Sequence, residues 1–203
     1  MRLRPIHYVA ILIGSILLIG AGAAPEIVDN PAYKNWAAFK VGTSITLSHN
    51  VNMGLEGWAM HDPTGEPPGP REIRQTYELV DLNPDKAVVT ETTTEIGDNS
   101  EAELSTVKIT YPAKVRSANF EVTPKDKLEG FAEGDEEVDL LGKKVKAHWV
   151  DTKMKIGDKI SESKVWMSDD VPGGVIKEVV TKRQGNKKLM ESTTTTLEIK
   201  RPS

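Results

Sequence analysis

The run from Lys143 to Lys200 constrains the fold of this chain more than any other stretch. At its start Val145, Ala147 and Trp149 alternate with polar residues, and a period of two places them on one face of a β-strand. No proline or glycine interrupts the apolar and β-branched segments that follow. The pattern predicts a four-stranded antiparallel meander. Its predicted strands are residues 144–150, 160–168, 175–184 and 187–200.

Short turn sequences separate these strands. Gly157-Asp158 and Gly185-Asn186 are typical of hairpin turns. Val171-Pro172-Gly173-Gly174 predicts a type II turn, since proline presets φ at the second position and glycine accepts a positive φ at the third. Asp169 and Asp170 precede this turn, and we expect their carboxylates to accept backbone N–H bonds there. These five residues, Asp169, Asp170, Pro172, Gly173 and Gly174, form the predicted turn motif.

Residues 1–23 have the pattern of a signal peptide. Arg2 and Arg4 precede an apolar stretch from Val9 to Ile19, and Ala21-Gly22-Ala23 resembles a cleavage site. The apolar stretch is shorter than the roughly 20 residues of a membrane span. We therefore predict export to the periplasm or the extracellular space. An uncleaved segment kept as an anchor is the alternative, and it would be the chain's only contact with a membrane.

Residues 24–203 are expected to form a single β-rich domain. Asn30-Pro31 predicts the start of one short helix that ends by Gly42. Prolines and glycines make residues 51–71 a loop, and the segment from Pro112 to Gly134 shows no clear period. Further strands are predicted at residues 43–48, 73–82, 87–96, 104–111 and 138–141. The expected fold class is all-β with minor α: an open, strongly curved antiparallel sheet or incomplete barrel of about nine strands.

Composition excludes several kinds of partner and chemistry. The formal net charge is −4, and about −6 without Arg2 and Arg4, which argues against nucleic acid and against docking on anionic lipid. No cysteine is present, so disulfides do not support the fold. No nucleophile motif, phosphate loop or dinucleotide fingerprint occurs. We predict no enzyme activity, no catalytic residues, no metal site and no cofactor. His49 and His148 are expected at exposed strand or loop positions.

Tryptophan and methionine residues are the candidates for ligand binding. Trp58, with Met53 and Met60, lies in the predicted loop, where adaptable apolar side chains suit a binding lid. Trp149 and Trp166 lie on predicted strands and are expected near the mouth of an apolar pocket. Packing in the core is the competing interpretation for both of these strand tryptophans.

Two segments carry a resemblance to known proteins. Trp166-Met-Ser-Asp-Asp-Val-Pro-Gly-Gly174 and Trp36-Ala-Ala-Phe-Lys-Val-Gly42 resemble segments of a group of exported bacterial β-rich proteins with a W-x-S-x-x-V-P-G-G turn. That group is uncharacterised, so the resemblance implies no activity. At a coarser level the expected sheet with a short helix resembles the bacterial lipoprotein carriers, half-barrels that hold acyl chains. This second likeness concerns fold alone.

Three hypotheses for function follow. The first is a non-enzymatic binding module of the cell envelope for an apolar small molecule or a lipid-like ligand. The second is a structural or interaction module whose sheet edges contact another envelope protein. The third, a hydrolase, would need a polar cluster assembled from residues that are distant in sequence.

Overall fold

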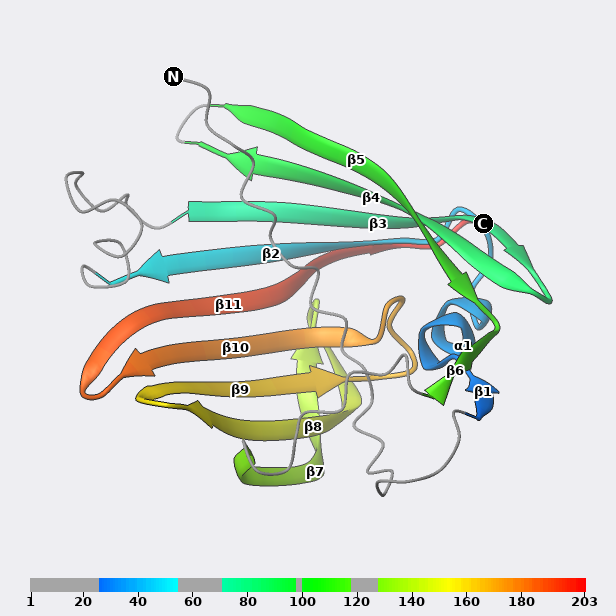
Figure 1. Ribbon diagram of the computed structural model, residues 1–203. Coiled ribbons are helices and arrows are strands. Elements are labelled where there is room, and N and C mark those ends of the chain that lie inside the picture. The colour runs from blue at the N-terminus through cyan, green and yellow to red at the C-terminus, as the bar shows by residue number, and fades with distance from the viewer. Residues whose placement is uncertain (1–25, 55–70, 98–99, 118–127) are drawn as a thin grey trace.

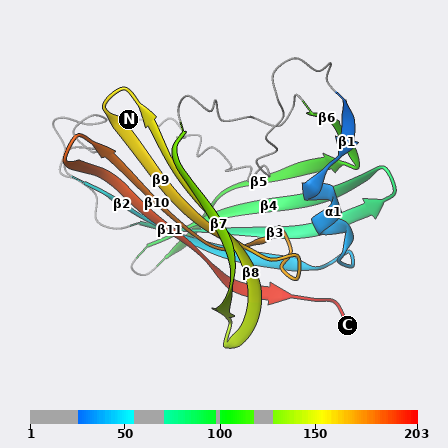
Figure 2. The same cartoon turned by 90° about the horizontal axis from the view of Figure 1, so that it is seen from below.

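A computed structural model of the protein describes residues 26–54, 71–97, 100–117 and 128–203. Nine antiparallel strands form one sheet in the order β5-β4-β3-β2-β11-β10-β9-β8-β7, and β1 and β6 form a separate two-stranded sheet. The large sheet is open, since β5 and β7 lie at opposite edges and do not pair with each other (Figure 1). It is also strongly twisted, and β9 and β10 run steeply across the direction of β3 and β4 in Figure 2. The all-β prediction with an open sheet and one short helix is confirmed.

The elements have the following bounds: β1 Ile27–Asp29, α1 Pro31–Ala37, β2 Ser44–Met53, β3 Arg71–Asn83, β4 Lys86–Ile96, β5 Glu101–Pro112, β6 Lys114–Arg116, β7 Leu128–Leu140, β8 Lys143–Ile156, β9 Lys159–Met167, β10 Val175–Gln184 and β11 Lys187–Lys200. Within the described ranges, no helix is long and apolar enough to cross a membrane.

The predicted meander is confirmed as β8 to β11, with β10 and β11 at the predicted bounds. Its turns follow the expected chemistry: Gly173 has φ 76°, and the Gly174 N–H donates to the Val171 carbonyl at 2.9 Å. The expected role of the two aspartates stays a prediction. Both side chains are exposed, and the Asp170 N–H donates a hydrogen bond to Ser168 Oγ at 3.3 Å.

The helix α1 covers one face of the sheet near the ends of β4 and β5. Its start is confirmed, because Asn30 Oδ1 accepts a hydrogen bond from the Ala32 N–H at 3.0 Å. Trp36, the buried residue of α1, belongs to the same hydrophobic cluster as Leu79 and Val89. The face that carries Ile45, Leu79 and Val89 is called the α1 face below.

Several predicted bounds are wrong. The helix ends at Ala37 rather than close to Gly42, and β2 continues through Met53 into the predicted loop. The segment without a clear period contains β6 and most of β7. The predicted strand at 138–141 covers only the end of β7, because β7 lies at an edge, where most of its side chains are exposed and acidic residues replace a regular apolar alternation. The predicted signal peptide lies outside the described residues.

Candidate functional site

Trp149 and Trp166 are neighbours on the face opposite the α1 face. They are directly paired residues of β8 and β9, and the register continues through Lys177 of β10 and Thr195 of β11. Directly paired residues point to the same side of a sheet. This side is called the tryptophan face below.

Lysines lie over both indole rings. Lys164 Nζ is 4.3 Å from the ring centroid of Trp149 and 4.8 Å from that of Trp166. Lys177 Nζ is 5.4 Å from the ring centroid of Trp166. These distances suit cation–π attraction. Gly134 of β7 is the residue paired with Trp149, and a Cβ built on it would lie 2.9 Å from Trp149 Cζ2. The Trp149 indole therefore packs against the β7 backbone at Gly134, where any larger residue would collide with the ring.

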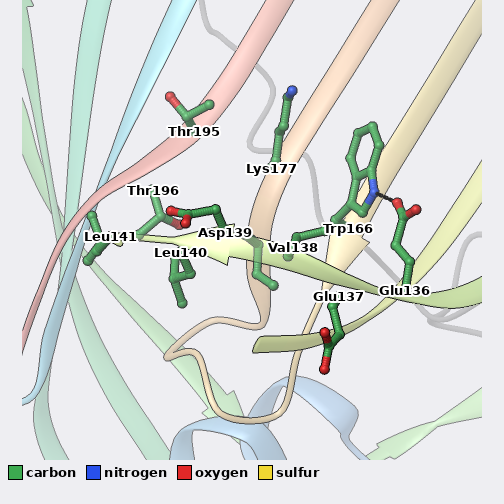
Figure 3. Close-up of a pocket in the computed structure, with 11 residues that line it drawn as sticks. Glu136, Glu137, Val138, Asp139, Leu140, Leu141, Trp166, Lys177, Thr195 and Thr196 are labelled. Carbon is green, nitrogen blue, oxygen red and sulfur yellow. Dashed lines mark hydrogen bonds between the residues drawn. The ribbon is translucent and has the colours of Figure 1, made fainter. Parts of the chain in front are cut away.

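A cavity of about 450 Å³ opens on the tryptophan face. The end of β7 crosses over β10 towards β11 and forms one wall, as Figure 3 shows. Trp166 lies on the facing side, and its Nε1 donates a hydrogen bond to the Glu136 carboxylate (dashed in Figure 3). The lining residues are Glu136, Glu137, Val138, Asp139, Leu140, Leu141, Trp166, Ile176, Lys177, Thr195 and Thr196.

The apolar part of the lining is continuous with the core. Leu140 is 9% exposed and Ile176 is 4% exposed, and both belong to the hydrophobic cluster. Val138 packs against the same cluster. Val138, Leu140 and Ile176, called the apolar floor below, therefore join the cavity lining to the core, and the charged lining residues lie on β7 and β10.

Charge in the lining is mostly negative. Glu136, Glu137 and Asp139 lie on β7, and Lys177 is the cation among the lining residues. Asp139 Oδ1 accepts a hydrogen bond from the Gly142 N–H at 3.0 Å, so it also holds the turn after β7. Throughout the described part of the chain, no group of three or more histidine, cysteine or acidic side chains could hold a metal ion.

The structure separates the candidate ligand-binding residues. Trp166 lines the cavity and Trp149 lies beside it on the same face. Met53 of β2 pairs with Met190 and lies on the α1 face. Ser48 pairs with Thr195 and so points to the tryptophan face, and Met53, five residues further along the strand, points to the opposite side. Trp58 and Met60 lie outside the described residues. Sequence reasoning missed Leu140, Leu141 and Ile176, because the crossing of β7 over β10 has no local sequence signal.

A row of polar side chains crosses the α1 face. His49 Nδ1 and Thr194 Oγ1 are 2.9 Å apart, and His49 Nε2 is buried and has no hydrogen-bond partner. Burial lowers the pKa of His49 from 6.5, and the neighbouring Gln75 side chain opposes this shift. The expectation that His49 is exposed is therefore wrong. A signal was present, since His49 continues the inward alternation of Ile45 and Leu47. His148 is exposed, as expected.

Two buried carboxylates belong to the same face. Glu178 is 6% exposed, and burial raises its pKa from 4.5, although a hydrogen bond from Ser163 Oγ at 3.3 Å opposes the shift. Glu91 accepts a hydrogen bond from Gln75 Nε2 at 2.7 Å. Burial, and to a smaller extent the charge of Glu91, raise the pKa of Tyr77 and of Tyr111 above 10. Both carboxylates accept a hydrogen bond, and within the described ranges neither belongs to a group that could hold a metal ion.

The turn motif supports the helix. Val171 and Pro172 are fully buried, and Asn35 Nδ2 donates to the Val171 carbonyl at 3.1 Å. A Cβ on Gly173 would lie 3.6 Å from the Trp36 ring. The two segments quoted for the resemblance are therefore in contact, and their shared role in this structure is packing between α1 and the β9–β10 turn.

Comparison with known proteins adds little. No protein-family model and no curated protein matches the chain. Among solved structures the chain is similar to a LolA superfamily protein from Nitrosomonas europaea, with 8% identity and a TM-score of 0.22 over 87% of this chain and 94% of that one. A likeness of this size carries no argument about function, and the fold assignment rests on the strand pairing described above.

Proposed function

We propose that this protein is an exported, non-catalytic module of the cell envelope that holds an apolar or lipid-like ligand in the cavity beneath the end of β7. The observation that carries the proposal is the cavity itself. Its volume of about 450 Å³ falls in the range of ligand pockets, roughly 300–1,000 Å³. An apolar floor with Trp166 at one side and charged residues around it suits an amphiphile with one alkyl chain.

The lining residues favour binding over catalysis. Among the described residues, the lining contains no histidine, serine or cysteine, and the Thr196 hydroxyl donates to the Val175 carbonyl at 3.1 Å. Glu136 is engaged with the Trp166 indole and Asp139 with the Gly142 N–H. A hydrolytic site would need a general base and an activated nucleophile within hydrogen-bond reach of each other. Export is supported by the charged, apolar and small-residue pattern of residues 1–23.

The negative charge of the lining predicts that uncharged and cationic headgroups bind more tightly than anionic ones. Three carboxylates against one lysine disfavour an anionic headgroup. In titrations of the purified protein followed by native mass spectrometry, we expect glycerol monolaurate and dodecyltrimethylammonium to bind about threefold or more tighter than laurate, and salt to reduce this difference. Laurate binding tightest would contradict the charge argument, and no binding by any of the three would contradict the proposed function.

Trp166→Ala locates the site. We expect it to weaken binding of glycerol monolaurate about tenfold, since an aromatic wall of the cavity is lost. The matched control is Val107→Ser, which changes an apolar residue on β5 that is 48% exposed and outside the cavity lining. Equal affinity for wild type and Trp166→Ala would show that the ligand binds elsewhere.

A second candidate function is a protein-interaction module that uses the sheet edges. Strand β5 favours it, because most of this edge strand is exposed, including Leu104 at 53%. An extended segment of another envelope protein would add to such an edge through main-chain hydrogen bonds. Cross-linking in the native cell distinguishes the two: one stoichiometric protein partner at β5 supports the second candidate.

A further inference from the structure

The turn between β7 and β8 contains a leucine in an unfavourable backbone conformation. Leu141 has φ 53° and Gly142 has φ 79°. Two-residue hairpin turns with positive φ at both positions favour Asn-Gly, because asparagine tolerates the left-handed region and most other side chains do not. Among the described residues, Leu141 is the one non-glycine residue with a positive φ.

Packing does not account for this leucine. Its side chain is 51% exposed. A Cβ added to the neighbouring Gly142 would meet nothing within 4 Å, so the tip of the turn is not pressed against another element. The hydrogen bond from the Gly142 N–H to Asp139 Oδ1 holds the turn without any contribution from the leucine side chain. Turn stability alone would favour a smaller polar residue here.

Leu141 is one of the residues that line the cavity. It follows the buried Leu140 in the lining and lies at the end of β7 near Thr196 of β11, as the close-up in Figure 3 shows. Backbone strain that persists at a residue lining a cavity points to a role in binding. We propose that Leu141 is a ligand-binding residue that closes the β11 end of the cavity over the alkyl chain of the bound amphiphile. This inference rests on the proposed function of the cavity.

The leucine side chain then has different surroundings in the two states. Without ligand it exposes apolar surface to water, and with ligand that surface is covered, which favours the bound state. The strained turn is present in both states, so its cost lowers stability without lowering affinity. Leu141 therefore lowers the stability of the protein and raises its affinity for the ligand, a trade-off that is common at functional sites.

The variant Leu141→Asn separates these two effects. Asparagine suits the turn, so we expect the Tm to rise by about 2–4 °C. Loss of the apolar contact should weaken binding of glycerol monolaurate about fivefold or more, measured by titration calorimetry on the full chain. Leu141→Met keeps an apolar side chain in the same turn and should bind within about twofold of wild type.

Leu104→Asn is the matched control, because it makes the same change at an equally exposed leucine on β5. We expect it to leave affinity unchanged. Binding by Leu141→Asn as tight as wild type overturns the inference alone. A fall in Tm together with weaker binding also overturns it, since the leucine would then support the fold. Wild-type protein that binds none of the amphiphiles overturns the proposed function and, with it, the inference.

Discussion

The α1 face and the tryptophan face are filled to very different degrees. Under α1, Leu79, Val89 and Val171 are 0% exposed. On the tryptophan face, a cavity of about 450 Å³ lies beneath the end of β7, and Leu141 at its edge is half exposed. The difference follows from the covering elements. A helix with a tryptophan and a buried Val-Pro turn fill one side, whereas β7 covers the other with a single strand that is rich in acidic residues.

This contrast assigns different roles to the two regions. Close-packed apolar contacts supply most of the stability of a domain. An open apolar floor costs stability unless something covers it. We therefore expect substitutions under α1 to change the free energy of unfolding most, and substitutions around the cavity to change binding most.

Trp36→Ala would break the filled region and should have the largest effect. Trp36 is 3% exposed within the hydrophobic cluster, and truncating such a residue costs about 3–5 kcal/mol of unfolding free energy. Urea denaturation followed by far-UV circular dichroism measures the loss. Val41→Ala, at a residue 49% exposed, is the control and should cost no more than about 0.5 kcal/mol. Similar losses for both variants would remove the contrast between the regions.

Gly134→Val would disturb the tryptophan face. Its Cβ would approach the Trp149 ring to 2.9 Å, so the ring must shift, and we expect a loss of about 1–3 kcal/mol. Near-UV circular dichroism reports the displaced indole. On the same strand, a Cβ at Gly130 would meet its nearest neighbour, Lys153 Cβ, at 3.5 Å. Gly130→Val is therefore expected to be neutral, and an equal loss there would contradict the close-approach argument.

Glu178→Gln tests a buried polar group on the α1 face, and of the three substitutions it should change the free energy of unfolding least. Burial raises the pKa of Glu178 above 4.5, so the unfolded chain loses its proton at a lower pH than the folded protein. Stability therefore falls as pH rises from about 4.5 through the folded pKa. At pH 7 the variant should gain about 1 kcal/mol, the scale for one poorly paired buried polar group. At pH 4 the gain should vanish.

Denaturation curves at the two pH values test this expectation. Glu198→Gln, at an exposed residue of β11, serves as the control and should change stability little at either pH. A gain for Glu178→Gln that persists at pH 4 would show that the carboxyl proton is not its cause.

Sequence patterns were sufficient where local geometry decides. Alternation located β8 to β11, and Pro172 with Gly173 predicted the turn whose φ and hydrogen bond the structure confirms. The same reasoning found only the end of β7, because acidic residues interrupt the period along the rest of the strand. It also placed His49 at an exposed position, although the inward alternation of Ile45 and Leu47 continues through His49. Pairing of Trp149 with Trp166 needed the register of two strands, which the turn at Gly157 sets.

The sequence by itself determined that this chain is a β-meander with one capped helix, because strand period, turn residues and caps are properties of neighbouring residues. Tertiary structure alone decided that β2 pairs with β11, that the turn at Pro172 packs on α1, and that β7 crosses over β10 to leave a cavity. These contacts join residues that are distant in the chain, and they depend on how far a nine-stranded sheet twists.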